Sequence, residues 1–306
     1  MNHPKQPPLV GIVVVDKPAG LSSAQVVHRI RLALREPRAG HTGTLDPLAT
    51  GVLPICLNVA TKLAGYLIAE DKRYTAQLQL GVETTTLDRL GQVTARASDH
   101  DVAAITDEAL QQVMSRFVGD QAQIPPMFSA IKVDGERLYK KARQGEVIDR
   151  APRHITIHSL RVVRRVGALV DIEVHCSKGT YIRSLVDDIG RALGVGAHIC
   201  ELRRTASGRF DIAQALPIEQ WTRPALAEGL ISLETATGLP QVAVDDNLVV
   251  RVRHGETMMP DELRIPEAMR SGSPFQLVAT RLDAELELLA IAHVAASRVR
   301  YARVFR

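Results

Sequence analysis

A short loop rich in glycine and proline constrains this chain more than any other segment. The stretch from Arg38 to Pro54 reads RAGHTGTLDPLATGVLP and holds three glycines, two prolines and a single carboxylate, Asp46. Glycine adopts backbone angles that other residues avoid, and proline fixes φ, so we expect one definite loop shape. Asp-Pro by itself is an ordinary turn signal. The loop predicts a rigid turn that presents Asp46, and the function of that carboxylate is the question.

One familiar carboxylate chemistry can be excluded. His41-Thr42-Gly43 resembles the Asp-Thr-Gly of aspartic proteases, whose sites need two facing carboxylates that share a proton. Here His41 stands in place of the aspartate, and no second Asp-Thr-Gly or Asp-Ser-Gly occurs in the chain.

Cofactor and metal motifs are also missing from the sequence. It contains no P-loop, no Gly-x-Gly-x-x-Gly and no His-Glu-x-x-His. The ten histidines show no ligand spacing, and Cys56, Cys176 and Cys200 form no Cys-x-x-Cys pair. We therefore expect no cofactor, no protein-bound metal, and three buried, reduced thiols.

The charge of the chain is compatible with nucleic acid but does not establish it. The net charge is +4, and 30 of the 38 basic residues are arginine, which contacts phosphate in a planar, bidentate way. Residues up to 238 carry 29 basic and 25 acidic side chains, and the remainder carries 9 of each. The last stretch nevertheless concentrates four arginines, which are Arg298, Arg300, Arg303 and Arg306.

Local patterns predict alternating strands and helices, followed by a small β-rich unit. Expected strands lie at 9–15, 52–57, 73–81, 154–163 and 168–176, and expected helices at 23–35, 60–70, 107–118 and 181–193. Ser22 with Gln25 predicts a capping box, Thr180 an N-cap, and Asp134-Gly135 a hairpin. Residues 198–210 are typical of a strand followed by a basic turn. After Gly238 and Pro240, short strands without a long helix indicate a small barrel-like domain.

Nothing in the sequence suggests a membrane or secreted protein. No apolar run approaches the ~18 residues that cross a bilayer, and the first ten residues lack a signal-peptide core. The expected location is the cytoplasm.

The whole sequence of the loop is a more specific signal than any of its dipeptides. GHTGTLDPLATGVLPICLNVATKL closely resembles the catalytic motif of the TruB family, the bacterial tRNA pseudouridine-55 synthases. GIVVVDKPAGLSS, DKRYTAQLQLG, IPPMFSAIKVDGERLYKKAR and CSKGTYIRSLVDDIGRALGVGAHICELRR resemble four further family blocks in the family order. Together these blocks span about residues 9–210. Residues 240–306 are similar, more weakly, to a PUA RNA-binding module.

The resemblance implies a fold and a function. The expected fold is α+β, with a mixed, largely antiparallel sheet and flanking helices in residues 1–238, and a PUA-like β-rich domain in residues 239–306. The expected activity is isomerisation of uridine 55 in the T-loop of tRNA, by base flipping and without a cofactor. The expected partners are the T-arm and acceptor stem of tRNA, and the chain is expected to act as a monomer without an obligate protein partner.

The resemblance also implies roles for individual residues. Asp46 corresponds to the catalytic carboxylate, and whether it attacks ribose C1′ or uracil C6 stays open. Arg183 corresponds to its cationic partner on the opposite wall of the cleft, and Tyr74 to a stacking platform that belongs to the catalytic set. Further positions for substrate binding are His41, Tyr181 and Leu202. Lys17 and Pro18 are expected to shape the turn that supports the catalytic loop.

Two further features bear on RNA binding. Thr85 stands where the family tends to have an aspartate, while Asp88 is kept, so the ordering of this loop on RNA is open. A basic cluster offers possible phosphate contacts and comprises Lys132, Arg137, Lys140, Lys141 and Arg143. Two other functions stay open, namely a tRNA-folding protein without catalysis and a guide-RNA-dependent synthase that works in a complex.

Overall fold

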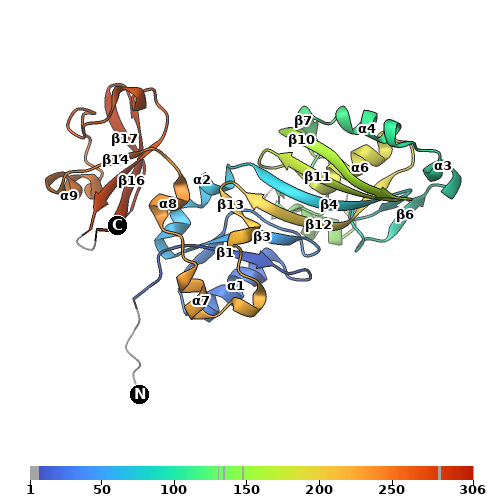
Figure 1. Cartoon of the computed structure of the whole chain (residues 1–306), viewed down its shortest axis with the longest axis horizontal. Coiled ribbons are helices and arrows are strands. Elements are labelled where there is room, and N and C mark those ends of the chain that lie inside the picture. Colours follow the sequence, from blue (N-terminus) through green and yellow to red (C-terminus); the bar gives the residue numbers. More distant parts are fainter. Residues whose placement is uncertain (1–6, 130, 134, 147, 282–283, 306) are drawn as a thin grey trace, which may run out of the picture.

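The computed structural model describes residues 7–129, 131–133, 135–146, 148–281 and 284–305, and its main element is a nine-stranded sheet (Figure 1). The strands lie in the order β1 (Gly11–Lys17), β3 (Thr50–Leu57), β12 (Ala197–Ser207), β4 (Lys72–Leu80), β11 (Leu169–Cys176), β10 (Arg153–Val166) and β7 (Gly119–Gln123), with β2 (Ala39–His41) on β3 and β13 (Phe210–Asp211) on β12. Every pair is antiparallel except β12 with β3. The expected mixed, largely antiparallel sheet is confirmed.

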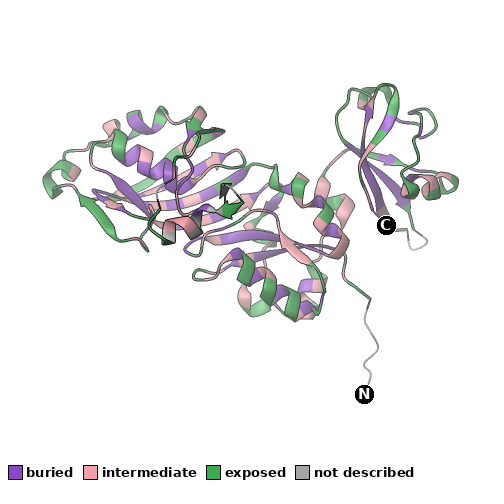
Figure 2. Ribbon diagram, turned by 180° about the vertical axis from the view of Figure 1, so that it is seen from behind, coloured by how far each residue is buried: buried purple, intermediate pink, exposed green. Residues whose placement is uncertain are grey.

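Two helices cover one face of the long strands. α4 (Asp107–Ser115) and α6 (Ile182–Ala192) pack into the same core cluster as the inward residues of β4, β10 and β11 (Figures 1 and 2). Strand alternation explains the arrangement, because Val170, Ile172, Val174 and Cys176 are buried while the residues between them are not. The face opposite α4 and α6 presents polar side chains, and we call it the open face.

Strand β1 is buried on both faces. Val13 and Val15 pack with α1 (Ser23–Leu34), while Ile12 and Val14 belong to a second core cluster on the other side. A strand covered on both sides needs an unbroken apolar run, and GIVVV supplies it. The expected capping box of α1 is confirmed, with the Ser22 hydroxyl and the Gln25 side chain exchanging hydrogen bonds with backbone N–H groups.

Short elements connect the long strands. They are η1 (Asn58–Leu63), α2 (Ala64–Ile68), β5 (Val82–Thr84), β6 (Val93–Arg96), α3 (Asp99–Ala103), β8 (Lys132–Val133), β9 (Glu136–Arg137), α5 (Leu138–Arg143), η2 (Ile212–Gln214), η3 (Ile218–Gln220), α7 (Arg223–Glu228) and α8 (Leu233–Thr237). β8 and β9 pair as the expected hairpin, although Asp134 itself lies outside the described residues. Among the helices of the described segments, none has the length and apolarity needed to cross a bilayer.

The C-terminal region forms a separate four-stranded sheet. It consists of β14 (Gln241–Ala243), β15 (Phe275–Thr280), β16 (Leu286–Ala295) and β17 (Arg298–Val304), with α9 (Asp246–His254) and η4 (Glu267–Met269) beside it. The expected β-rich region is confirmed, while the nine-residue α9 was not predicted. Apolar side chains between the sheet and α9 form a core of their own.

The C-terminal sheet also shares apolar contacts with the main body. Val278, Ile291 and Phe305 belong to one buried cluster with Ile12 and Val52 of β1 and β3. Lys62 adds a polar contact, because its Nζ donates to the Val304 carbonyl at 3.0 Å and lies 5.7 Å from the centre of the Phe305 ring. The division at residues 238 and 239 stays a prediction.

Three local predictions were wrong, two of them where a strand pairs within the main sheet. The Thr180 hydroxyl donates to the Ser177 carbonyl, and the N-cap of α6 is Tyr181 without a side-chain cap. α4 ends at Ser115, and Gly119, with φ of +95°, already begins β7. β12 runs on to Ser207 because it pairs with β4, so the basic residues lie in the strand. Of the cysteines, Cys200 is only half-buried.

Candidate active site

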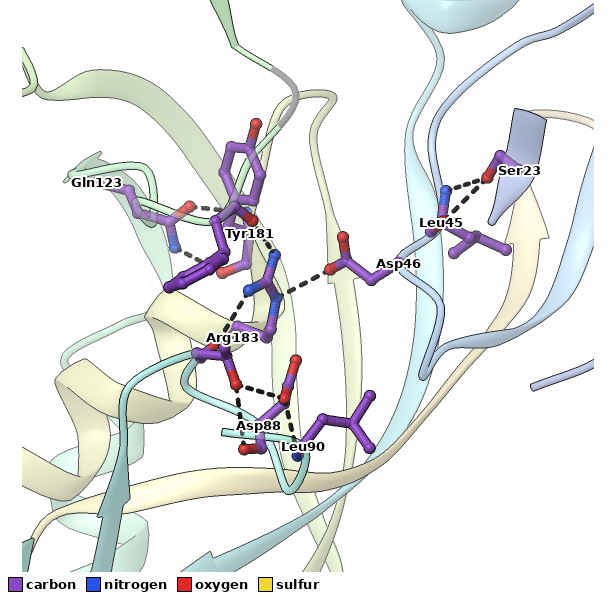
Figure 3. Close-up of polar contacts among 10 residues, drawn as sticks. Ser23, Leu45, Asp46, Asp88, Leu90, Gln123, Tyr181 and Arg183 are labelled. Carbon is purple, nitrogen blue, oxygen red and sulfur yellow. Dashed lines mark hydrogen bonds and ion pairs between the residues drawn. The ribbon is translucent and has the colours of Figure 1, made fainter. Parts of the chain in front are cut away.

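An ion pair joins the glycine-rich loop to α6. Arg183 donates from Nε to Oδ2 of Asp46 at 2.8 Å (Figure 3). The guanidinium is almost fully buried, with 4% of its side chain exposed, whereas the Asp46 side chain is 33% exposed. The loop between β2 and β3 supplies the carboxylate, and the first turn of α6 supplies the cation. The buried cation thus holds an accessible carboxylate, and the two side chains approach from separate elements.

Two side chains fix the loop on either side of Asp46. The Ser23 hydroxyl, at the start of α1, donates to the Leu45 carbonyl at 2.9 Å and accepts from the Leu45 N–H at 2.8 Å (Figure 3). Lys17, fully buried at the end of β1, donates from Nζ to the carbonyls of Ala49 at 2.6 Å and Pro47 at 3.4 Å. These contacts give Lys17 the supporting position that the sequence predicted for it.

A buried arginine anchors the loop from β12. Arg204 is 1% exposed and donates to the carbonyls of Val52 at 2.7 Å and Gly43 at 3.3 Å. It approaches β3 closely because Gly51, with φ of +101°, lacks a side chain; a Cβ there would lie 2.1 Å from the Arg204 carbonyl oxygen. Both the left-handed φ and the contact require glycine at this position.

The remaining donors of Arg183 hold two further segments. Its NH1 donates to the Thr86 carbonyl and its NH2 to the Phe128 carbonyl, each at 2.8 Å. Asp88 orders the first of these segments, because its Oδ1 accepts from the Thr86 hydroxyl at 2.6 Å and from Leu90 N–H at 3.0 Å (Figure 3). Thr85 accepts from the Gln92 N–H within the same loop. Arg183 therefore joins two further segments to the loop of Asp46.

Tyr181 is positioned by a buried amide. Gln123, on β7, accepts from the Tyr181 N–H at 2.7 Å and donates to the Tyr181 carbonyl at 3.1 Å (Figure 3). Gln123 is 5% exposed, so both ends of its amide are used in the interior. These two hydrogen bonds set where α6 begins and hence where Arg183 points.

A cavity of about 240 Å³ lies beside the ion pair. Its walls include Asp46, Tyr74, Tyr181, Arg183 and Leu202. Burial raises the pKa of both tyrosines above the usual value, and the Arg204 side chain, which hydrogen-bonds Tyr74, opposes the rise at Tyr74. Both phenols are thus neutral at pH 7, and the cavity has aromatic walls around one carboxylate.

Two larger hollows lack this combination of groups. One, of about 780 Å³, lies between the end of β4 and the helices α3 and α4, and the other, of about 390 Å³, lies on the open face. Neither is lined by Asp46, Tyr74 or Arg183. The smaller cavity is the better candidate because the reactive side chains converge there.

Some residues that the sequence predicted for RNA binding do not line the cavity, and the side chains of others lie outside those that the structure describes. His41 is half-buried in β2 and does not line the cavity; its Nδ1 accepts from the Gly43 N–H at 3.4 Å within the loop. In the basic cluster, the side chains of Lys132, Arg137, Lys140 and Arg143 lie outside those that the structure describes. RNA contacts by these residues stay predictions.

Comparisons with known proteins show the family of this chain. The family model of the TruB family pseudouridylate synthase N-terminal domain matches residues 31–182, and that of the tRNA pseudouridylate synthase B C-terminal domain matches residues 183–228. The tRNA pseudouridine synthase B of Nitrosococcus oceani is 42% identical over 86% of this chain and 85% of its own length, and that of Stutzerimonas stutzeri is 48% identical over 70% and 68%. The chain belongs to the TruB family.

Solved structures similar to this TruB-family chain include chains of two complexes. A chain of a Cbf5–Nop10–Gar1 complex superposes with a TM-score of 0.70 at 28% identity, over 97% of this chain and 84% of that one. A chain of an H/ACA ribonucleoprotein bound to a substrate RNA containing 2′-deoxyuridine gives a TM-score of 0.71 at 26% identity, over 97% and 85%.

Three residues of the site were missed by sequence reasoning. Ser23, Gln123 and Arg204 each use a buried polar group to hold the loop or α6. The sequence indicates Ser23 only as the first residue of a helix. For Arg204, the alternation of β12 could have indicated burial, because Arg204 lies two residues after the buried Leu202 and so on the same face of the strand. Gln123 carried no local signal.

Proposed function

We propose that this protein isomerises uridine 55 in the T-loop of tRNA. Its membership of the TruB family makes it a pseudouridine synthase that acts on tRNA. The observation that carries the finer proposal is the pairing of a buried Arg183 with an accessible Asp46 at a cavity walled by Tyr74 and Tyr181.

The reaction requires little besides a well-held carboxylate. The bond from ribose C1′ to uracil N1 breaks, a bond from C1′ to C5 forms, and the proton lost from C5 is balanced by one gained at N1. No electron or group enters, so the proposal includes no cofactor. Asp46 acts as the nucleophile at C1′ or at C6, and the hydrogen bond from Arg183 holds its carboxylate in place.

The cavity favours a base that has left its stack. Ligand pockets commonly measure ~300–1,000 Å³, so a cavity of about 240 Å³ suits one nucleoside rather than a helix. Flipping costs a few kcal/mol, and stacking on an aromatic ring returns about 1–3 kcal/mol. We assign the stacking platform to Tyr74, and Tyr181 and Leu202 to the walls around the base. His41 lies near enough in the loop to contact RNA outside the cavity.

The wider proposal concerns the rest of the tRNA. Residues 1–238 bind the T-arm and carry the chemistry, and residues 239–306 form a PUA-like domain that contacts the acceptor stem. The protein acts in the cytoplasm as a monomer on tRNA without a guide RNA. The similarity to Cbf5 complexes keeps a guide-dependent synthase as the second candidate.

A single assay tests the proposal and its rival. Purified protein is incubated with an unmodified T-arm stem-loop in EDTA, without any other RNA or protein, and pseudouridine is mapped. We expect product at position 55 with the wild type and none with Asp46→Asn, whose RNA affinity should stay within a few-fold. Asp101→Asn, which changes an exposed carboxylate in α3, is the matched control.

The contrary results are equally clear. Full turnover by Asp46→Asn would remove the role given to that carboxylate. Product that appears only with an added guide RNA or partner protein would favour the second candidate. Activity that returns only on addition of a metal ion would contradict the cofactor-free reaction.

A further inference from the structure

Three side chains outside the proposed reaction converge beside the open face of the main sheet. Asp71 precedes β4, His158 lies on β10 and His175 on β11. Nε2 of His158 lies 3.1 Å from Oδ2 of Asp71, and Nε2 of His175 lies 3.8 Å from the same oxygen. One candidate ligand atom from each residue falls within 4.8 Å of the others. The chain thus assembles two imidazoles and one carboxylate from three separate segments.

A β-bulge brings the two histidines together. Ile157 pairs with Cys176 and Ser159 with His175, so His158 is the extra residue in the ladder between β10 and β11. The alternation of β11 places His175 on the opposite face from the buried Cys176. The bulge brings the centre of the His158 ring to 4.6 Å from the centre of the His175 ring. Bulges commonly redirect a side chain beside a functional site.

The third group is held by the backbone. The Asp71 carbonyl accepts from the Gly208 N–H at 2.8 Å, which attaches this residue to the turn after β12. All three side chains are partly exposed, at 49% for Asp71, 36% for His158 and 31% for His175. An ion from solvent can therefore reach the three ligand atoms.

We propose that Asp71, His158 and His175 form a zinc-binding site. Zn²⁺ takes histidine nitrogen and carboxylate oxygen at about 2.0–2.2 Å in tetrahedral geometry, which places neighbouring ligand atoms roughly 3.3–3.5 Å apart. The two separations of 3.1 and 3.8 Å from Asp71 bracket that value, so small side-chain rotations suffice. Solvent supplies the fourth ligand. Burial lowers the pKa of His175, and the positive charge of Arg73 nearby lowers it further, repels a metal ion and limits the affinity of the site.

The site is separate from the candidate active site. None of its three residues lines the cavity beside Asp46, although Lys72, the neighbour of Asp71, does. Zinc bound here therefore stabilises the junction of β4, β10 and β11 and takes no part in the isomerisation. The linear sequence did not indicate the site because its ligands are 17 to 104 residues apart (175 − 158 and 175 − 71).

Zinc titration of the full-length chain tests the proposal. After treatment with EDTA and its removal, calorimetry should show one Zn²⁺ per chain, and Co²⁺ should give a spectrum of nitrogen and oxygen ligands without a thiolate band. Loss of a group that merely supports a ligand costs about 10–100-fold in affinity, so Asp71→Asn, His158→Ala and His175→Ala should each weaken binding at least about tenfold.

Two controls separate this site from adventitious binding. His154→Ala removes another histidine of β10, whose Nε2 lies 3.7 Å from Asp120, and should leave binding unchanged. Cys200→Ser removes the thiol 3.8 Å from His198 and should also have no effect. Zinc should raise the Tm of the wild type and not of His158→Ala. Absence of saturable binding, equal binding by all variants, or a loss confined to Cys200→Ser would overturn the proposal.

Pseudouridine formation is a separate readout. The three ligand variants should convert the T-arm stem-loop at the wild-type rate, so failure of the zinc site would leave the proposed function untouched.

Discussion

At the scale of single residues, the site is built from buried cations that use backbone carbonyls as partners. Lys17, Arg183 and Arg204 are all buried, with at most 3% of the whole residue exposed in each case. A buried charge is costly unless its hydrogen-bonding groups are satisfied, and here carbonyls of the loops satisfy them. The cations therefore hold the loops, and Arg183 alone of the three hydrogen-bonds Asp46 in the described structure.

The ionisation of Lys17 leads to a test by pH. Burial lowers the pKa of Lys17 from 10.5 to about 8, against the attraction of Asp46. Between pH 8 and 10.5 the unfolded chain binds more protons at Lys17 than the folded protein does, so stability at this site rises with pH. Urea unfolding of the wild type and of Lys17→Met should show the wild type gaining relative stability from pH 7.5 to pH 10. Lys72, with a similarly lowered pKa, is present in both proteins and cancels.

The wild type and Lys17→Met should also differ in stability and in kcat. Lys17→Met leaves three carbonyl contacts unmade, which should cost about 1–3 kcal/mol of stability and reduce kcat because Asp46 is less well held. A difference in stability that is constant with pH would show that Lys17 stays charged in the folded protein.

At the scale of elements, the parallel contact between β3 and β12 determines the shape of the loop that carries Asp46. Gly51 pairs with Arg204, whose guanidinium then reaches the Val52 and Gly43 carbonyls. A glycine in a strand often marks such a close backbone approach. The loop is therefore held on both sides, by β12 and by α1.

Gly51→Ala tests this close approach. The methyl group meets the Arg204 carbonyl oxygen and the left-handed φ disfavours alanine, so we expect a loss of about 2 kcal/mol or more in the free energy of unfolding. Turnover of the stem-loop should fall as well, because Arg204 must move. Unfolding by urea and single-turnover kinetics measure the two effects.

Gly65→Ala is the matched control within the same region. A methyl group at Gly65 would have no atom within 4 Å of it, and this glycine is in α2, where alanine is favoured by about 1 kcal/mol. The control should be as stable as the wild type or more so. Equal stability of both variants would mean that β3 can separate from β12 without cost.

At the scale of the whole molecule, the C-terminal sheet is attached by a shared core. Ile12 and Val52 are fully buried, and they share an apolar cluster with Ile291 and Phe305. Deleting residues 240–306 would uncover this cluster. Point substitutions on the exposed surface of β17 are therefore a cleaner test of its role in RNA binding than truncation.

The arginines of β17 provide that test. Arg298 and Arg300 are exposed, Arg303 is exposed too, and Arg306 lies outside the described residues. Removal of one phosphate contact should reduce the slope of log K against log salt by about 0.7–0.9. Replacing the three exposed arginines with glutamine should weaken binding of full-length tRNA and flatten its salt dependence. Turnover of a saturating T-arm stem-loop should be unchanged.

A control within the same domain shows whether the effect is local. Arg264 is an exposed arginine outside β17, and its NH2 lies 3.2 Å from Oδ2 of Asp245. The substitution Arg264→Gln removes this one charge. Its salt slope should match that of the wild type. Tight binding of full-length tRNA by the triple variant would contradict a phosphate contact by these three arginines.

The sequence by itself determined the features that depend on near neighbours. The apolar run of β1, the alternation of β11 and the capping box of α1 follow from residues a few positions apart, and the structure confirms all three. The family and its fold followed from ordered blocks of residues, and the comparisons confirm them. The roles given to Asp46, Arg183, Tyr74 and the other site residues stay predictions.

Only the tertiary structure decided which distant groups meet. Gln123 reaches Tyr181 across 58 positions, Arg204 reaches Gly43 across 161, and Asp71, just before β4, meets His158 and His175. Strand pairing also overrode a local signal, since β12 pairs with β4 and extends through two arginines where a turn was expected. The physical reason is that a buried polar group must find a partner, and the fold, rather than the neighbouring sequence, determines which partner is within reach.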